Sequence, residues 1–281
     1  MTLRVGHIAY ANCIPFFHYL GECGFSGQTV SGVPSTLNAL LATGQIDLSP
    51  SSSIEYGRNW ARYLLLPGLS ISSRGAVGSV LLFTHEPLEN LADSPIAVTG
   101  ESATSIILLR ILLKEFLKFP VVPRLVSFGP VEERIAAGGS GLLIGDRALR
   151  ASLDGLAPWI YDLGELWWHY TGLPFVFALW VVGHPAAQAK SEELALFRNQ
   201  LGESLARVLA DPEGTAAQVP EYHWFGRSRL AAYWRAMSYD FSADHRQGLE
   251  LFFRLAVRHR LLTELPQLKF FSGSSPGAVA R

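Results

Sequence analysis

The chain has 281 residues, of which 49% are hydrophobic and 11% aromatic, so it can bury the core of one large domain or of two moderate ones. Its formal net charge is −1, with 23 lysines and arginines against 24 aspartates and glutamates, which argues against nucleic acid as a partner. Two cysteines are too few for a disulfide framework, and the eight histidines show no H-x-x-x-H pairing. We therefore expect no metal site.

The N-terminal sequence "MTLRVGHIAY" enters a strand pattern directly. It lacks the basic stretch, apolar stretch and small-residue cleavage site of a secretory signal peptide. No apolar run approaches the roughly 18 residues that a membrane span requires. We expect a cytoplasmic protein that does not associate with a membrane.

Strand and helix patterns alternate through the first two thirds of the chain. We expect strands at 3–10, 46–52, 76–86, 95–100, 123–129, 141–149 and 174–183. We expect helices at 34–44, 87–93, 104–117 and 131–139, the first with Ser35 as N-cap and Gly44 as its stop signal. From Ser191 onward the pattern predicts amphipathic helices over 191–212 and 248–262, and no further strand.

This alternation predicts an α/β fold with a largely parallel sheet. Because no linker interrupts the chain, we expect the second domain to be inserted in the first, with two strands, 79–86 and 175–183, crossing between the lobes. The predicted division places 1–84 and 179–281 in lobe 1 and 85–178 in lobe 2. A two-lobed α/β protein joined by two strands binds its ligand in the cleft between the lobes.

Polar side chains occur where the expected strands end, which is where open α/β sheets bind ligands. They are Asn12, Ser51, Ser52, Ser53, Ser102, Thr104, Ser105 and Asp146, with Ser79 inside an apolar strand. Helix capping is the better explanation for Ser51 to Ser53 taken alone. The "GESATS" segment also suits an anion, because three hydroxyls surround the start of an apolar helix. Asn12 is the hardest to explain structurally, since asparagine is unfavourable in strands and a buried amide needs partners.

Patterns for nucleophilic catalysis are absent from the sequence. It contains no G-x-S-x-G elbow and no phosphate-binding G-x-x-x-x-G-K-[ST] loop. His7, His169, Glu55 and Asp146 are candidate general bases, although such residues more often serve as structural hydrogen bonders. The residues by themselves predict a cleft lined with hydroxyls that binds a small carboxylate.

A set of segments in a fixed order resembles a known family. "IAYANCIPFFHYL" resembles the I-x-Y-x-N-x-x-P-F opening of the MqnA-type chorismate dehydratases of menaquinone biosynthesis, and "GVPSTLNALLATGQIDLSPSSSIEYGRN" resembles their second block. The likeness continues through "VGSVLLF", "ESATSIILLRILL", "LLIGDRAL", "DLGELWWHYTGLPFVFALW" and "YWRAMSYDF…GLELFF", and covers roughly residues 4 to 262. Ala11 departs from it, because a bulky residue is expected beside the asparagine.

The resemblance implies a two-lobed fold like that of type II periplasmic binding proteins, and no cofactor. It also implies a carbon–oxygen lyase of the futalosine pathway that converts chorismate to 3-[(1-carboxyvinyl)oxy]benzoate and water. On this view Ser102, Thr104 and Ser105 bind one carboxylate, while Ser51, Ser52, Ser53 and Ser79 bind the other, with Asp146 also in the substrate site. Asn12 and Ser79 are the catalytic candidates, and Asn12 holds the leaving hydroxyl or orients the ring.

The base stays open at this point: the enolpyruvyl carboxylate of the substrate is one candidate, and Asp146, His7 or Glu55 is the other. Rival functions also stay open. They are the sister MqnD-type lyase that forms 1,4-dihydroxy-6-naphthoate, a solute-binding protein of a transporter, and a non-catalytic sensor of small carboxylates. The C-terminal helices offer a surface for a homodimer or for closing the cleft.

Overall fold

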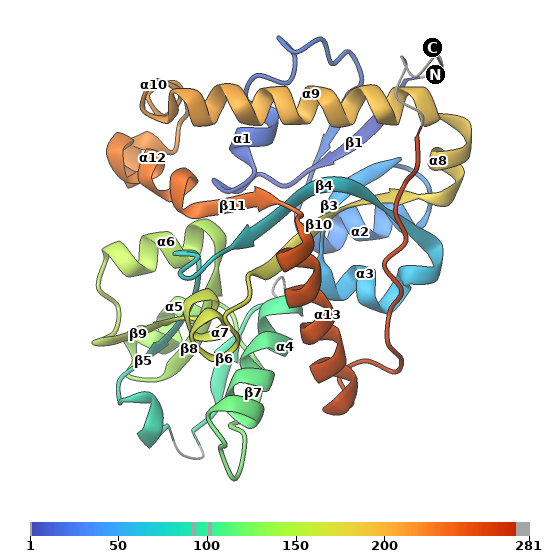
Figure 1. The fold of residues 1–281 in the computed structure, drawn as a ribbon. Coiled ribbons are helices and arrows are strands. Elements are labelled where there is room, and N and C mark those ends of the chain that lie inside the picture. Colours follow the sequence, from blue (N-terminus) through green and yellow to red (C-terminus); the bar gives the residue numbers. More distant parts are fainter. Residues whose placement is uncertain (1, 92–93, 101–102, 274–281) are drawn as a thin grey trace.

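The computed structural model describes residues 2–91, 94–100 and 103–273, and its strands form two separate sheets, one above the other in Figure 1. The first sheet has the order β11-β4-β10-β3-β1-β2. Its strands are β1 (Arg4–His7), β2 (Gln28–Ser31), β3 (Leu48–Ser52), β4 (Tyr63–Ser73), β10 (Phe175–Gly183) and β11 (Met237–Asp240). β1 runs parallel to β2 and β3, whereas β10 and β11 pair antiparallel.

The second sheet has the order β7-β6-β8-β5-β9. Its strands are β5 (Val80–Thr84), β6 (Ile96–Val98), β7 (Leu125–Ser127), β8 (Ser140–Ile144) and β9 (Trp159–Asp162). β6 pairs in parallel with β7 and β8, and β5 pairs antiparallel with β8 and β9. We call each sheet with its helices a lobe, so the first sheet belongs to lobe 1 and the second to lobe 2.

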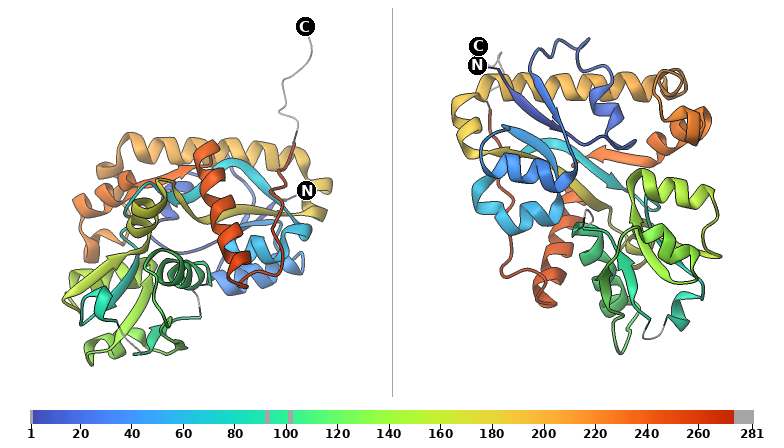
Figure 2. Two further views of the ribbon diagram at one scale, coloured as in Figure 1. Left: turned by 60° about the horizontal axis from the view of Figure 1, so that its bottom comes forward. Right: turned by 180° about the vertical axis from the view of Figure 1, so that it is seen from behind.

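Helices cover both sheets (Figures 1 and 2). Those of lobe 1 are α1 (Ile14–Phe17), α2 (Pro34–Ala42), α3 (Ser53–Asn59), α8 (His184–Ala189), α9 (Ser191–Ala210), α10 (Pro212–Ala216), α11 (Tyr222–Phe225), α12 (Arg227–Ala236) and α13 (Ala243–Arg258). Those of lobe 2 are α4 (Ala103–Ile111), α5 (Val131–Ala136), α6 (Gly145–Leu153) and α7 (Leu163–Thr171). Two 3₁₀ helices, η1 (Trp60–Arg62) and η2 (Leu88–Asn90), and the π-helix η3 (Leu112–Phe116), which continues α4, complete the set. No helix in the described ranges has the length and apolar character needed to cross a bilayer.

The chain passes between the lobes in two connections. The first, 74–79, joins β4 of the first sheet to β5 of the second, and the second, 172–174, joins α7 to β10. β5 therefore pairs entirely within the second sheet and β10 entirely within the first, so the crossings lie before these strands and not inside them. Apolar character predicted both strands, but it does not indicate which sheet a buried strand joins.

Several elements differ from the sequence expectation. β2 and β9 were not predicted as strands, and the expected strand 141–149 ends at Ile144, where the helix α6 follows. β4 was not predicted, because Pro67 and Gly68 interrupt it; its pairing with β10 shifts register there, and Gly68 has φ of +85°. β11 is a strand within the region expected to contain none, and its four residues are too few to show a periodic pattern. α2 begins at Pro34 after Val33, and not at a Ser35 cap, since proline favours the first position of a helix.

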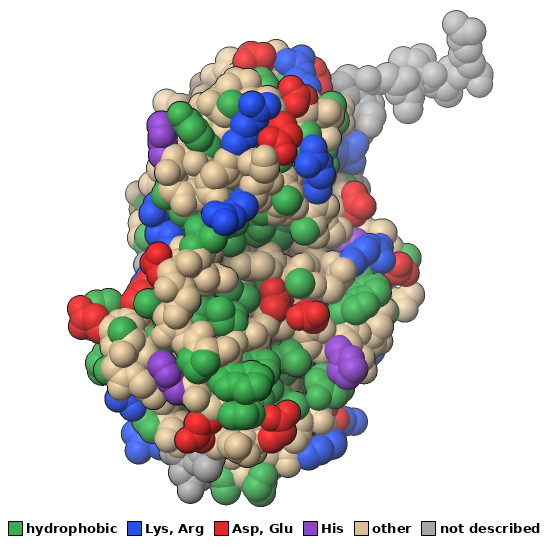
Figure 3. Space-filling view, turned by 90° about the vertical axis from the view of Figure 1, so that its left-hand side faces the viewer, with side chains coloured by type: hydrophobic (Ala, Val, Ile, Leu, Met, Phe, Trp, Pro, Cys, Tyr) green, Lys and Arg blue, Asp and Glu red, His purple; other side chains and the backbone are tan. Residues whose placement is uncertain are grey.

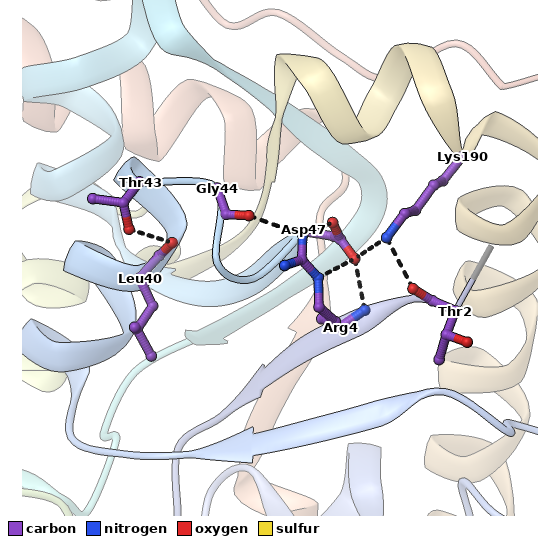
Figure 4. Close-up of polar contacts among 7 residues, drawn as sticks. All are labelled: Thr2, Arg4, Leu40, Thr43, Gly44, Asp47 and Lys190. Atoms are coloured by element: carbon purple, nitrogen blue, oxygen red, sulfur yellow. Dashed lines mark hydrogen bonds and ion pairs between the residues drawn. The ribbon is translucent and has the colours of Figure 1, made fainter.

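A buried ion cluster fastens the N-terminal strand of lobe 1 (Figure 4). Asp47, only 4% exposed, accepts hydrogen bonds from Arg4 N (2.7 Å), Arg4 Nη2 (2.8 Å) and Lys190 Nζ (2.6 Å). Lys190 Nζ also donates to Thr2 O (2.9 Å). Burial by itself would raise the pKa of Asp47, but the hydrogen bonds from Arg4 and Lys190 outweigh it and hold that pKa below its ordinary value. The cluster joins β1, the start of β3 and the start of α9.

Candidate active site

A cavity of about 90 Å³, partly open to solvent, lies between the lobes. Lobe 1 and lobe 2 both contribute to its wall. The described residues that line it are Ile8, Tyr10, Asn12, Cys13, Pro34, Ser52, Ile71, Ser79, Val80, Ala103, Thr104, Ser105, Ile144, Gly145, Phe177 and Ala178. Five predicted site residues are thus brought together: Asn12, Ser52, Ser79, Thr104 and Ser105.

Asn12 lies in the turn between β1 and α1, where the backbone N–H and C=O groups of the preceding residue, Ala11, are both hydrogen-bonded. Ala11 N–H donates to Asp146 Oδ1 (2.9 Å), and Ala11 O accepts from Trp234 Nε1 (2.8 Å). Ala11 is fully buried, which explains why a small residue stands here. The Asn12 Oδ1 atom is buried and has no hydrogen-bond partner among the described residues. A buried amide oxygen in a cavity wall is available to a ligand.

Ser79 lies at the end of the 74–79 connection, directly before β5, and not inside a strand. Its side chain is 1% exposed, and its Oγ accepts a hydrogen bond from the Tyr233 hydroxyl (2.8 Å). Its carbonyl oxygen accepts from Gly145 N–H (2.8 Å). Ser79 thus lines the cavity on a backbone that is fixed to lobe 2.

Thr104 and Ser105 lie in the first turn of α4, and both are buried. Thr104 Oγ1 accepts from Ile54 N–H at the start of α3 (3.0 Å), a contact that joins the two lobes. The hydroxyl proton of Thr104 has no acceptor in the described ranges, so it can be donated to a ligand. The amino end of α4 adds backbone N–H groups and a positive helix end, which together favour an anion.

The other predicted serines lie elsewhere. Ser51 is fully buried in β3 with an unpartnered Oγ and does not line the cavity, and Ser53 Oγ donates to Val176 O (2.6 Å). Ser52, the N-cap of α3, accepts from Glu55 N–H (3.4 Å) and also lines the cavity. Period-2 alternation along β3 explains why one serine reaches the cavity while its neighbour does not. Ser102 lies outside the described residues.

Asp146 is in the first turn of α6, where the sequence suggested a strand end. It does not line the cavity; it holds the Ala11 peptide across the cleft. Burial raises the pKa of Asp146, and the hydrogen bond from Ala11 N–H opposes that rise. Next to it, Gly145 has φ of +59°, and a Cβ there would come within 3.2 Å of the Tyr10 ring. Glycine therefore lets lobe 1 approach lobe 2 closely at this point.

The remaining candidate bases do not line the cavity. His7 packs against Phe17 (ring centroids 4.1 Å apart), Glu55 accepts from Asn59 Nδ2 (2.9 Å), and His169 is exposed beside Tyr170. Burial lowers the pKa of His7. Cys13 does line the cavity, but burial raises its thiol pKa far above the ordinary value, so the thiol stays protonated.

Sequence reasoning missed three residues that shape the site: Tyr10, Tyr233 and Trp234. Tyr10 lines the cavity, and the other two bond to Ser79 and Ala11 from α12. Tyr233 and Trp234 open the segment "YWRAMSYDF", which carried part of the resemblance, but no spacing rule connects them to Asn12 or Ser79. By contrast, Trp167 is fully buried core, while Trp168 and Tyr170 are exposed, and none of the three lines the cavity.

Charge on the molecule is mixed. On the face in Figure 3, acidic and basic side chains are interspersed and form no continuous basic surface. Within the described ranges, no group of three or more histidine, cysteine, aspartate or glutamate side chains could hold a metal ion.

Comparison with known proteins gives the family. A family model described as menaquinone biosynthesis matches residues 3–258. The chain belongs to this family. A chorismate dehydratase from Thermus thermophilus is 35% identical over 233 residues, which cover 75% of this chain and 80% of that protein.

Solved structures support the fold. A protein from Archaeoglobus fulgidus superposes with a TM-score of 0.73 at 18% identity, covering 93% of this chain and 98% of the other. The periplasmic aliphatic sulphonate binding protein SsuA from Escherichia coli gives 0.69 at 15% identity, covering 98% and 93%. The predicted α/β, periplasmic-binding-protein-like fold and the menaquinone-biosynthesis family are therefore confirmed.

Proposed function

We propose that this protein is a chorismate dehydratase, a hydro-lyase that forms 3-[(1-carboxyvinyl)oxy]benzoate and water. The family and the 35% identical chorismate dehydratase support this activity. The observation that carries it in this chain is the cavity itself. It combines Asn12, whose amide oxygen is unpartnered in the described ranges, with the hydroxyl residues Ser79, Thr104 and Ser105 around one shared space.

The reaction needs little more than positioning. The ring carbon that bears the ether loses its proton, and the electrons of that C–H bond enter the ring. The C–O bond to the neighbouring hydroxyl breaks, the hydroxyl leaves with a proton as water, and the ring becomes aromatic. Because aromatisation drives the step, the protein has to hold the substrate and stabilise the negative charge that develops.

Each cavity group has a matching task. The amino end of α4, with Thr104 and Ser105, suits one carboxylate, because it supplies N–H and O–H donors beside a positive helix end. Ser52, at the end of β3, and Ser79, in the 74–79 connection, line the same cavity. The Asn12 oxygen can accept a hydrogen bond from the leaving hydroxyl and so fix its orientation.

The residues that line the cavity bear on the identity of the base. Among the described lining residues, none is histidine, aspartate, glutamate or lysine, and Cys13 is held protonated. This supports the hypothesis that the enolpyruvyl carboxylate of the substrate itself removes the ring proton. Intramolecular proton transfer of this kind is efficient when the reacting groups are held in contact.

The test is to incubate the purified protein with chorismate and identify products by chromatography and mass. Loss of one water, with appearance of the carboxyvinyl ether of benzoate, is the expected result. Unchanged chorismate would overturn the proposal. Cleavage of a cyclic futalosine derivative would then indicate the sister lyase, and a rise in melting temperature with chorismate but no turnover would indicate a binding protein.

A further inference from the structure

Helix α12 stands behind the cavity and contacts the segments that carry both catalytic candidates. Its consecutive residues Tyr233 and Trp234 are 7% and 0% exposed. Tyr233 donates to Ser79 Oγ (2.8 Å), and Trp234 Nε1 donates to Ala11 O (2.8 Å), next to Asn12. Two consecutive residues of one helix, more than 150 residues along the chain from Ser79 and Ala11, thus bond to Ser79 and to the residue before Asn12.

The Tyr233–Ser79 hydrogen bond has a defined direction. Tyr233 is buried and does not line the cavity, and among the described residues Ser79 Oγ is the one partner of its hydroxyl, so Tyr233 donates its proton to Ser79. Ser79 Oγ therefore accepts in this pair. The Ser79 proton has no acceptor among the described residues, and Ser79 lines the cavity, so that proton is available to the substrate.

The backbone of Ser79 is already fixed by other contacts. Asp162 accepts from Val77 N–H (2.9 Å) and Gly78 N–H (2.6 Å), and Gly145 N–H binds the Ser79 carbonyl. Gly78 has φ of +72°, and the Tyr233 ring lies 3.6 Å from where its Cβ would be. What Tyr233 adds to this rigid turn is the direction of the Ser79 hydroxyl.

We propose that Tyr233 is a positioning residue that makes Ser79 a hydrogen-bond donor toward the substrate. This inference rests on the proposed dehydration. In that reaction both the ring carboxylate and the leaving oxygen gain negative charge in the transition state. A donor aimed at either oxygen binds the transition state more strongly than the ground state, so its loss lowers kcat more than it raises KM.

The decisive variant is Tyr233→Phe, which removes only the hydroxyl. We expect kcat to fall about tenfold with KM within about twofold, the size of one hydrogen bond. Tyr239→Phe is the matched control, because Tyr239 is also buried (4% exposed) but its hydroxyl has no partner in the described ranges. We expect Tyr239→Phe to keep the unaltered turnover.

A double-mutant cycle separates positioning from general stability. In a Ser79→Ala background, Tyr233→Phe should change kcat by less than about twofold, because there is no hydroxyl left to orient. Equal turnover of Tyr233→Phe and Tyr239→Phe would overturn the proposal. So would a tenfold loss that persists in the Ser79→Ala background, since that loss would not pass through Ser79.

Chorismate affinity, measured by calorimetry on the same variants, keeps this inference separate from the proposed function. If the unaltered protein dehydrates chorismate and Tyr233→Phe is normal, only the inference fails. If it binds chorismate without turnover and Tyr233→Phe weakens binding about tenfold, the proposed function fails and the orienting role of Tyr233 stands. If it neither binds nor converts chorismate, both fail.

Discussion

Strands β1 and β3 are parallel neighbours, and their two ends differ sharply in how polar groups are satisfied. At their amino ends, Arg4 and Asp47 form a buried cluster with Lys190 in which both oxygens of the carboxylate are paired. At their carboxyl ends, Asn12 and Ser52 face a cavity, and the Asn12 oxygen has no partner in the described ranges. At the amino ends the chain itself supplies hydrogen-bond partners for these polar groups, whereas at the carboxyl ends a ligand can supply the missing partner.

An unpartnered polar atom does not mark a site by itself. Trp180 Nε1 and Tyr239 OH are also buried without partners in the described ranges, yet neither lines the cavity. What distinguishes Asn12 is that this residue, with its unpaired oxygen, lines a hollow that both lobes form. An unpartnered polar atom therefore indicates a binding site only when its residue also lines a cavity.

The largest effect we expect is on stability at the amino ends. Asp47→Asn should lower the free energy of unfolding by about 3–5 kcal/mol, because it leaves the buried ammonium of Lys190 without its counter-charge. Denaturant titration measures this loss. The matched control is Asp244→Asn, whose ion pair with Arg74 is exposed and should contribute less than about 1 kcal/mol. Equal losses for the two variants would mean that the buried pairing of Asp47 stabilises the fold no more than an exposed ion pair does.

At the carboxyl ends, Asn12→Ala should lower kcat about 10²–10³-fold, the usual effect of removing one oriented polar group from an active site. Steady-state kinetics with chorismate measures it. Asn38→Ala is the control, since Asn38 Oδ1 is also buried and unpartnered but does not line the cavity. If Asn12→Ala kept near-normal turnover, the assignment of Asn12 would be wrong.

A smaller effect distinguishes positioning from proton transfer at Asp146. Asp146→Ala should lower kcat/KM about tenfold, because the Ala11 N–H loses its acceptor. Asp146→Asn should stay within about threefold of the unaltered protein, since an amide oxygen still accepts that hydrogen bond. If Asp146→Asn abolished turnover while chorismate still bound, the carboxylate would be the base, and the substrate-assisted mechanism would be excluded.

The smallest effect we expect is on the pH dependence of stability. The folded-state pKa of Asp47 lies below its unfolded value of about 3.9, so its contribution to stability is present above that value and is lost as pH falls through the folded pKa. Asp146 affects stability in the opposite direction. Its folded pKa is raised, so the stability that it contributes falls as pH rises from the unfolded pKa toward the folded one. We expect the difference in melting temperature between the unaltered protein and Asp47→Asn to narrow below about pH 4. A gap that stayed constant down to pH 3 would contradict this.

Much of the fold could be predicted from periodicity. Apolar strands such as 175–183 and the buried helix α4 follow from composition alone. β4 could not be predicted in the same way, because its Pro67–Gly68 bulge breaks the alternation, and β11 is too short to have a period. The crossings were predicted inside two strands and lie just before them, since hydrophobicity does not encode sheet membership.

The site was predictable only in part. Asn12 and Ser79 were found because a polar residue in an apolar setting is unusual, and both line the cavity. Tyr233 and Trp234 were missed, because their roles depend on tertiary contacts with residues far away in the chain. Substrate roles for the serines, a cytoplasmic location and a homodimer stay predictions.

The amino ends of β1 and β3 stabilise the fold, whereas their carboxyl ends contribute to turnover. The most direct test measures turnover of chorismate and melting temperature side by side for Asn12→Ala and Asp47→Asn at neutral pH. We expect Asn12→Ala to lose turnover while its melting temperature stays near that of the unaltered protein. We expect Asp47→Asn to lose melting temperature while each folded molecule keeps its turnover at 25 °C. Parallel losses of both properties in both variants would contradict the claim.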